Sequence, residues 1–256
     1  YRYDEKNRLV EKKLPAKDWE YIVYDKADRI VMTGPVYSPF GDGGKGWLFT
    51  KYDVMNRVTY TGYYNGHSVT AANRKAIKDL VYAQTDNNES KTTANQTVDG
   101  VAIRYSNTKF PTGSVNLLTV NYYDDYNYPG APTSFPSIGG QPTVQTVKGL
   151  ATGSWTRVVT TAAERKATQN YTLYNAKYQP LRTYSKNHLG GYTYSDNVLT
   201  FTGVPTKTTT KHRRANSGTV LTIVDNYTYD EQLRLTKHTQ KTGSQAEQLI
   251  TENVYD

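Results

Sequence analysis

The sequence contains no cysteine, and only 5 Phe, 3 Trp, 2 Met and 4 His occur among its 256 residues. Without cysteine the chain has no disulfide, no thiol nucleophile and no Cys-based zinc or iron–sulfur site. No run of about 18 apolar residues occurs, so we predict no membrane-spanning helix. The chain therefore cannot be stabilised by disulfides, and it has few of the largest apolar side chains for a thick core.

Residues suited to catalysis or metal binding are equally sparse. No two histidines lie at a metal-ligand spacing, and neither H-E-x-x-H nor G-x-S-x-G occurs. The acidic pair Asp124-Asp125 has the residue types of a calcium site or of a glycosidase pair. Adjacent strand residues point to opposite faces, which argues against joint catalysis. We therefore expect no enzyme, no cofactor and no metal. The histidines, taken as surface or packing residues, are His67, His188, His212 and His238.

Tyrosine is abundant, with 24 copies, while hydrophobic residues make up 36% of the chain and the mean hydropathy is −0.74. A tyrosine ring can pack while its hydroxyl stays in water, and Tyr and Thr favour strands. This composition predicts a mainly β protein with thin layers. Tyr rings on exposed faces are interpreted as cross-strand pairs, with sugar stacking as the alternative.

The net charge is +8. Its one tight basic cluster, Lys211-His212-Arg213-Arg214, is interpreted as a solvated turn between strands. The other Lys and Arg residues alternate with Asp and Glu, so we expect no specific nucleic-acid partner.

One phrase recurs: YDEKNRL at 3–9, YDKADRI at 24–30, YDVMNRV at 52–58 and YDEQLRL at 229–235. An aspartate at the first turn position can accept bonds from backbone N–H groups further on. Asn7, Asp28 and Asn56 hold the fourth turn position, and such residues tolerate a positive φ. The phrase predicts a hairpin with a type I turn followed by a left-handed residue. Leu233 fits that position worse.

Arginine follows aspartate by four residues in every copy. We expect a structural clasp, in which Arg pairs with the carboxylate and stacks on a Tyr ring; the alternative is a repeated ligand-binding Arg. Residues 174–182 resemble a degenerate copy with a longer turn, and Tyr255-Asp256 would begin another. The predicted structural motif comprises Tyr3, Asp4, Arg8, Tyr24, Asp25, Arg29, Tyr52, Asp53, Arg57, Tyr229, Asp230 and Arg234.

Three regions are expected. Residues 1–62 form repeat hairpins, 63–100 a helical insertion and a polar loop, and 101–256 further hairpins. Apolar spacing over 68–82 predicts one amphipathic helix capped by Ser68 or Thr70, either packed on the sheet or binding a partner. Residues 83–100 are predicted to be a flexible surface loop. The proline-rich stretch 129–146 is predicted to cross the fold without a central strand. Glycines at 40–46 form a plain loop, because no phosphate-binding motif is present.

The repeated phrases resemble the YD repeats of the RHS family. The segments WLFTKYDVMNRVTYTGYY, VNYYDDYNYP and KGLATGSWTRVV are similar to the RHS-like proteins of Bacteroidetes, as is YSKNHLGGYTYSDNVLTFTGVPTKTTTKH. The resemblance spans most of the chain. It implies tandem antiparallel hairpins that coil into a curved, spiralling shell or ribbon. The Asp-Pro-x-Gly type of self-cleavage signature does not occur here, so neither autoproteolysis nor a toxin is assigned to these residues.

The resemblance also implies a role. The chain would be a non-catalytic segment of a larger secreted or cell-surface protein, whose shell encloses or delivers a C-terminal effector or toxin. The alternative is a surface adhesion or carbohydrate- or protein-binding module associated with secretion or motility machinery. Expected partners are the remaining repeats of the same polypeptide, a toxin cargo, a secretion-system or surface protein, and glycans. Export by the outer-membrane system of Bacteroidetes, type IX secretion, is a further expectation.

Overall fold

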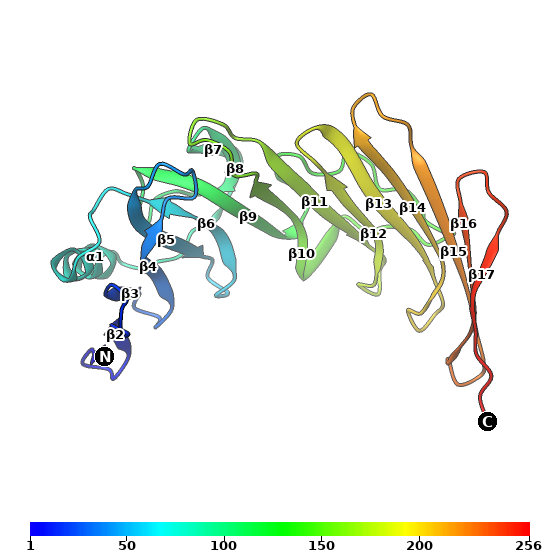
Figure 1. Cartoon of the computed structure of the whole chain (residues 1–256), viewed down its shortest axis with the longest axis horizontal. Coiled ribbons are helices and arrows are strands. Elements are labelled where there is room, and N and C mark those ends of the chain that lie inside the picture. The colour runs from blue at the N-terminus through cyan, green and yellow to red at the C-terminus, as the bar shows by residue number, and fades with distance from the viewer. The chain divides into compact units, whose positions relative to one another are not determined.

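The computed structural model describes all 256 residues, of which 51% lie in strands and 5% in a helix. Fifteen strands form one antiparallel sheet in chain order, and two others form a separate hairpin, β7–β8 (Figure 1). The mainly β prediction is therefore confirmed, as is the succession of antiparallel hairpins.

The first group of elements is β1 (Arg2–Tyr3), β2 (Leu9–Lys12), β3 (Glu20–Tyr24), β4 (Ile30–Tyr37), β5 (Lys45–Tyr52), β6 (Val58–Tyr64), α1 (Ala71–Ala83), β7 (Lys91–Val98), β8 (Val101–Tyr105) and β9 (Val115–Asp125). The second group is β10 (Thr146–Arg157), β11 (Ala167–Tyr174), β12 (Pro180–Lys186), β13 (Gly190–Leu199), β14 (Pro205–Ala215), β15 (Leu221–Tyr229), β16 (Leu235–Thr242) and β17 (Gln248–Glu252).

The chain divides into two compact units. Unit 1 comprises residues 1–121, 127–129 and 156–166, and unit 2 comprises residues 122–126, 130–155 and 167–256.

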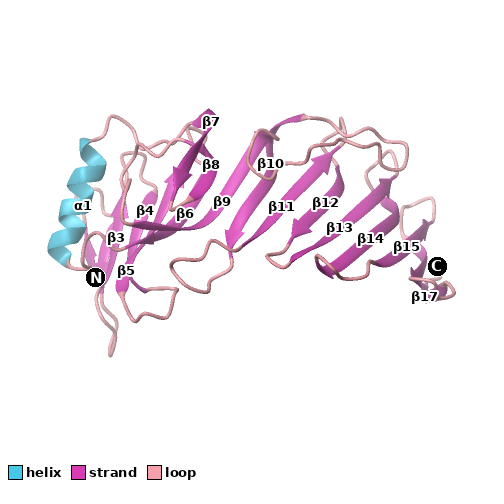
Figure 2. Ribbon diagram, turned by 90° about the horizontal axis from the view of Figure 1, so that it is seen from above, coloured by secondary structure: helices cyan, strands magenta, loops and turns pink.

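Unit 1 has a buried core to which several of its strands and its helix contribute. The sequence Trp47-Leu48-Phe49-Thr50-Lys51 alternates along β5, and its first, third and fifth side chains are all buried. Helix α1, beside β3 in Figures 1 and 2, adds Ile77 and Val81 to the buried residues. A period-2 strand and a period-3.6 helix thus each bury one apolar face.

The helix forms where the sequence predicts it. Its N-cap is Thr70, whose Oγ1 accepts a hydrogen bond of 3.2 Å from the backbone N–H of Asn73. Such a bond satisfies one of the free N–H groups at a helix start. Ser68 instead accepts from the Asn73 side chain.

The prediction of a flexible loop over 83–100 is wrong in its second half. Residues 91–98 form β7, which pairs with β8 around the turn Asp99-Gly100. Both turn residues have positive φ, 51° and 73°, the conformation that an Asp-Gly hairpin turn requires. Buried Ile103 and Tyr105 then bring this polar hairpin into the core, where the Tyr105 and Tyr60 rings lie 6.4 Å apart.

The proline-rich stretch contains no strand between Pro129 and Gln145, as predicted. Its part within unit 2, residues 130–145, is called the strap. The strap is fixed by the Phe135 ring, 5.0 Å from Tyr126, and by a 3.0 Å bond from Gln141 Nε2 to the Leu199 carbonyl. Buried Ile138, Leu173 and Leu181 mark the small core of unit 2. From Tyr192 to Asp256 no residue is buried.

Candidate functional site

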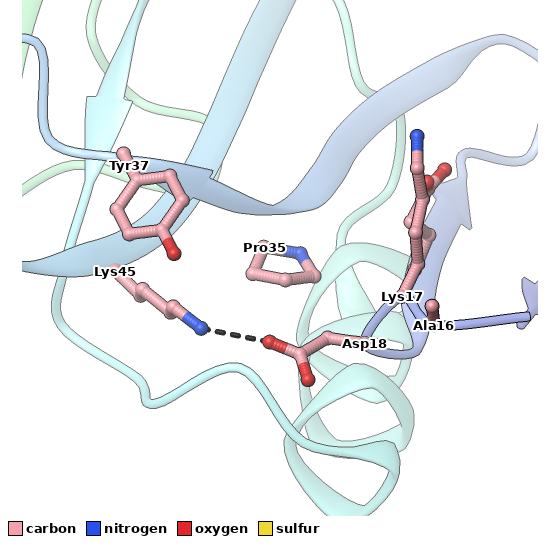
Figure 3. Close-up of a pocket in the computed structure, with 7 residues that line it drawn as sticks. Ala16, Lys17, Asp18, Pro35, Tyr37 and Lys45 are labelled. Atoms are coloured by element: carbon pink, nitrogen blue, oxygen red, sulfur yellow. Dashed lines mark hydrogen bonds and ion pairs between the residues drawn. The ribbon is translucent and has the colours of Figure 1, made fainter. Parts of the chain in front are cut away.

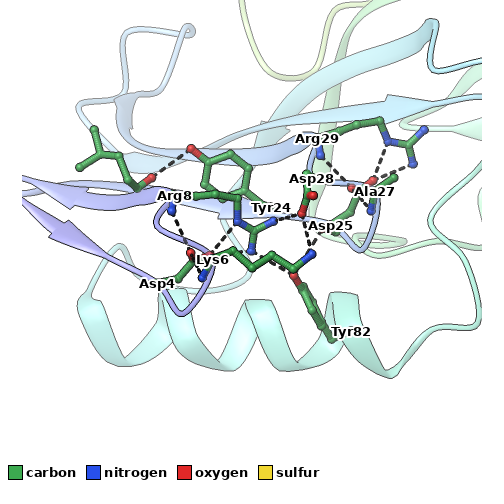
Figure 4. Close-up of polar contacts among 10 residues, drawn as sticks. Asp4, Lys6, Arg8, Tyr24, Asp25, Ala27, Asp28, Arg29 and Tyr82 are labelled. Carbon is green, nitrogen blue, oxygen red and sulfur yellow. Dashed lines mark hydrogen bonds and ion pairs between the residues drawn. The ribbon is translucent and has the colours of Figure 1, made fainter.

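The four predicted repeat turns share one set of contacts. In the second copy, Asp25 Oδ1 accepts from the backbone N–H groups of Ala27 and Arg29, both at 2.9 Å (Figure 4). Its Oδ2 accepts from Arg29 Nε at 2.7 Å, and its own N–H bonds the Arg29 carbonyl at 2.9 Å. The same Nε···Oδ2 contact measures 2.6–2.8 Å in all four copies. The predicted pairing of each arginine with the aspartate of its own turn is therefore confirmed.

The fourth turn residue is left-handed in each copy. The φ angles are 58° at Asn7, 61° at Asp28, 63° at Asn56 and 61° at Leu233. Asn and Asp adopt this conformation readily, whereas a leucine there is strained. The Asp230–Arg234 contacts therefore hold Leu233 in a conformation that its own side chain disfavours.

Sequence reasoning misjudged three further turns. The stretch 174–182 has a turn of the same length as the others, not a longer one. Asn175 takes the Asp position and Gln179 the Arg position, with their side chains 2.8 Å apart and Tyr178 at φ 63°. An amide pair can replace the ion pair because Asn175 Oδ1 still accepts from the backbone N–H groups of Lys177 and Gln179, while Asn175 Nδ2 donates to Gln179 Oε1.

The other two turns begin at Asn187 and Thr200. Their side-chain oxygens accept from the backbone N–H groups of Gly191 and Val204, four residues on. A glycine occupies the left-handed position of each turn. An Asx or Thr residue followed three positions later by Gly is the signal that would have found these turns.

The arginine does not stack on the tyrosine of its own copy. The Arg8 guanidinium carbon lies 4.6 Å from the centre of the Tyr24 ring, in the next copy, and the Tyr24 hydroxyl donates to the Leu9 carbonyl at 3.0 Å (Figure 4). Each hairpin is thereby joined to the following one. We call this pair of contacts the repeat latch.

The latch recurs in two more places. Arg29 lies 4.7 Å from the Tyr52 ring, whose hydroxyl donates to the Ile30 carbonyl at 2.8 Å. Arg234 lies 4.4 Å from the Tyr255 ring, whose hydroxyl donates to the Leu235 carbonyl at 2.8 Å. Tyr255 therefore occupies the position that the repeat spacing assigns to it.

Related contacts lie at other turns. After the third copy, Asn121 Nδ2 donates to the Val58 carbonyl at 3.2 Å. In unit 2, the Tyr229 hydroxyl donates to the Pro205 carbonyl at 2.9 Å, directly after the turn that begins at Thr200. The hydroxyl contact is thus retained at a turn without arginine.

Hydrogen bonding sets the charge state of two turns. Burial opposes ionisation of Asp4, but bonds from the Arg8 side chain and from the Arg8 and Lys6 backbones lower its pKa to about 2. Burial also opposes ionisation of Asp230, but hydrogen bonds from the backbone and side chain of Arg234 lower the pKa of this carboxyl group below its usual value. Both carboxylates are therefore ionised, and able to pair, down to acidic pH.

A buried ion pair in unit 1 was not predicted. Lys51 Nζ lies 2.8 Å from Glu89 Oε1, with side chains only 3% and 0% exposed. Glu89 also accepts from the Thr108 and Lys109 backbone N–H groups. The pair joins β5 to the segments that flank the β7–β8 hairpin. No local pattern signals a contact between residues so far apart in sequence.

Unit 2 carries a row of tyrosines on one sheet face. Tyr171, Tyr184 and Tyr194 are direct neighbours on β11, β12 and β13, and Tyr192 lies on the same face of β13. Successive ring centres are 4.6 Å (Tyr171–Tyr184), 6.1 Å (Tyr184–Tyr192) and 5.8 Å (Tyr192–Tyr194) apart. We call these four residues the tyrosine ladder. The interpretation as cross-strand pairs is confirmed here, because the rings face one another.

Cations surround the ladder. Arg182 lies 4.6 Å from the Tyr194 ring and pairs with Asp196 at 2.6 Å, and Arg213 lies 4.9 Å from the Tyr192 ring. The strand register places five further lysines on this face: Lys186, Lys207, Lys211, Lys237 and Lys241.

The basic cluster at 211–214 is therefore not a turn. It lies within β14, where Lys211 and Arg213 share the ladder face and the intervening residue points to the other face. Strand alternation separates a cluster that looks continuous in sequence.

The opposite face of the same strands is rich in hydroxyl groups. Ser195 and Thr210 are hydrogen-bonded at 2.8 Å, and Thr193 Oγ1 lies 2.7 Å from His212 Nδ1. His238 Nε2 lies 2.8 Å from Asp225 on this face. These polar pairs cross neighbouring strands and stabilise a sheet that lacks an apolar layer.

The remaining candidates have structural contacts. Asp124 has φ 73°, and its Oδ1 accepts from the Gly149 N–H at 2.7 Å. His67 Nδ1 lies 2.6 Å from the Tyr64 hydroxyl. No group of three His, Cys, Asp or Glu side chains is placed to hold a metal ion.

A surface pocket of about 350 Å³ lies in unit 1, between the β2–β3 loop and β4–β5 (Figure 3). The ion pair between Lys45 and Asp18, 2.8 Å long, crosses it beside Pro35 and the exposed Tyr37. Glu20, which also lines the pocket, pairs with Lys12 at 2.7 Å.

No family model matches the chain, and no curated protein matches it significantly. No helix of the structure is long and apolar enough to cross a membrane.

Proposed function

We propose that the chain is a structural segment of a YD-repeat protein of the RHS type, forming part of a curved β wall that encloses or delivers a C-terminal effector. The chain then acts outside the cell or at its surface, without catalysis of its own. Its immediate partners are further repeats of the same polypeptide. The resemblance of the repeated phrase supplies the family, and the repeat latch carries the physical argument.

The latch supports this role because it connects one hairpin to the next by side chains that belong to the repeated phrase. A protein built from such units is stabilised mainly by contacts between neighbours, so it can lengthen without a new core. The polar character of both faces in β13–β17 suits a wall with water or a polar cargo on each side.

The test is to image the complete polypeptide that contains this chain by cryo-electron microscopy. We expect hairpins that continue the sheet around a separate, enclosed domain. A sheet that remains open, with both faces in solvent and no enclosed domain, contradicts the proposal.

A second candidate is binding of an acidic ligand at a surface, favoured by the cations of the ladder face. The register places seven Lys and Arg side chains on this face with two carboxylates, Asp196 opposite Arg182 and Glu252 opposite Lys237. Because the rings stack on each other, the attraction is electrostatic rather than ring-to-sugar stacking. An acidic glycan is the simplest extracellular ligand of this charge.

This candidate is tested by binding to acidic and neutral glycans in rising salt. We expect salt-sensitive binding of acidic glycans that Lys211→Ala and Lys241→Ala weaken and Lys91→Ala, in unit 1, does not. Equal binding of neutral glycans, or equal loss in all three variants, contradicts it.

A further inference from the structure

The tyrosine ladder is the most oxidisable accessible cluster in this chain. There is no cysteine, Met32 is buried, and Met55 is the only other methionine. One-electron oxidants that would attack thiols elsewhere therefore act mainly on phenols, on Met55 and on Trp19 here, since Trp47 and Trp155 are buried. The ladder rings are half-buried, so small oxidants reach them.

Within the ladder, Tyr171 and Tyr184 form the closest pair. Their ring centres lie 4.6 Å apart with planes 11° from parallel, on adjacent antiparallel strands and directly opposite each other. Cβ atoms of such pairs are about 4.5–5.5 Å apart. Rotations of exposed side chains take picoseconds to nanoseconds, so the ortho carbons of the two rings can meet without a change in the backbone.

Solvent has a route to this pair. A surface pocket of about 280 Å³ is lined by strap residues 130–134 and by Gln169, Tyr171, Tyr184 and Lys186. The buried pair Tyr60 and Tyr105, with rings 6.4 Å apart, has exposures of only 0% and 1%. A small oxidant can therefore reach Tyr171 and Tyr184, but not Tyr60 and Tyr105.

We propose that Tyr171 and Tyr184 form an oxidative cross-linking site, joined as dityrosine by a haem peroxidase with hydrogen peroxide or by another one-electron oxidant. Each phenol gives one electron to the oxidant and one proton to water, leaving two tyrosyl radicals. The radicals couple by a carbon–carbon bond between ortho carbons. The hydrogen on each of these carbons then moves to the oxygen through water, which restores both phenols. The product has lost two hydrogen atoms, and one molecule of peroxide has become two of water.

The cross-link closes the β11–β12 hairpin around the turn from Asn175 to Gln179. It gives a cysteine-free chain the kind of covalent closure that a disulfide gives other extracellular proteins, because it restricts the unfolded chain. Oxidation would then strengthen unit 2, which has few buried residues.

The experiment oxidises the 256-residue chain, at low concentration, with a phenol-oxidising peroxidase and hydrogen peroxide. We expect a monomeric product lighter by two hydrogen atoms, with dityrosine fluorescence. After trypsin, peptide 167–177 should be linked to peptide 183–186. The oxidised chain should unfold at higher denaturant concentration than the untreated chain.

Three variants make the test specific. Tyr171→Phe and Tyr184→Phe should each lose most of the intramolecular product, while Tyr227→Phe keeps it, because the Tyr227 ring stacks on His238 at 4.7 Å. Circular dichroism before oxidation checks that each variant keeps its strands. Cross-links found only between molecules, linked peptides from other tyrosines, or an unchanged yield in Tyr184→Phe would each overturn the proposal.

Discussion

Unit 1 and unit 2 use the same turn but bury it differently. In unit 1 the Asp25–Arg29 side chains are 0% and 11% exposed, whereas in unit 2 those of Asp230–Arg234 are 20% and 42% exposed. Helix α1 and the β7–β8 hairpin add a second layer to unit 1, and strands β13–β17 have none. The repeated phrase therefore specifies the hairpin and its link to the next one, while a core arises only where an insertion covers the sheet.

The largest expected loss of stability is in unit 1, whose sheet is covered by the insertion. Lys51→Ala leaves Glu89 buried without its cation, which costs about 3–5 kcal/mol. Urea unfolding of unit 1 measures the loss. The double variant Lys51→Met/Glu89→Leu should recover most of it, since a buried pair can be replaced by apolar side chains. If the double variant is as unstable as Lys51→Ala, apolar side chains cannot replace the ion pair, and the prediction is wrong.

The next prediction compares the same latch in both units. Arg29→Ala leaves the buried Asp25 carboxylate unpaired and uncovers the Tyr52 ring, so we expect a loss of about 3 kcal/mol. Arg234→Ala removes a more exposed pair and should cost about 1 kcal/mol or less. Denaturant midpoints of the two variants measure the difference. Equal losses would mean that burial does not set the strength of the latch.

A smaller change should stabilise unit 2. Leu233 is 48% exposed and holds φ 61°, and a left-handed L-residue costs about 1–2 kcal/mol, of which Asn recovers a part. Leu233→Asn should therefore raise stability by about 1 kcal/mol at most. Asn7→Leu, at the same left-handed position of the first copy, is the converse control and should lower it by a similar amount. Thermal unfolding followed by circular dichroism measures both.

The smallest expected effect depends on pH. The pKa of Asp4 falls from its ordinary value of 3.8 to about 2 in the folded chain. Its contribution to stability is complete above pH 4 and is lost as the pH falls toward 2, because the unfolded state then binds the proton first. Asp4→Asn should flatten this part of the stability profile, and Asn175→Ala should not. Unfolding midpoints between pH 6 and 2 measure the slope.

Much of the local structure could be predicted, because it depends on short stretches. The repeated phrase indicates the turns through its Asp, Asn and Arg positions, and apolar spacing indicates α1. The Asp99-Gly100 dipeptide also predicts a hairpin turn, but the polar residues around it favoured the interpretation as a flexible loop. The partner of each stacked arginine could not be read, because the distance from Arg to the next Tyr differs from copy to copy.

The buried Lys51–Glu89 contact likewise depends on how the β7–β8 hairpin packs. The ladder face required the registers of several strands before its cations could be placed on one side. These features depend on contacts between distant residues, which composition and periodicity do not determine.

The repeat latch has a mechanical consequence. Each arginine holds the tyrosine of the hairpin that follows, so a force pulling hairpins apart across the sheet loads one latch at a time. Extension should then proceed in steps, each releasing one hairpin, with higher force peaks for the buried Arg29–Tyr52 latch than for the exposed Arg234–Tyr255 latch. A sheet joined in this way yields gradually at its weakest hairpin, and its other hairpins stay paired.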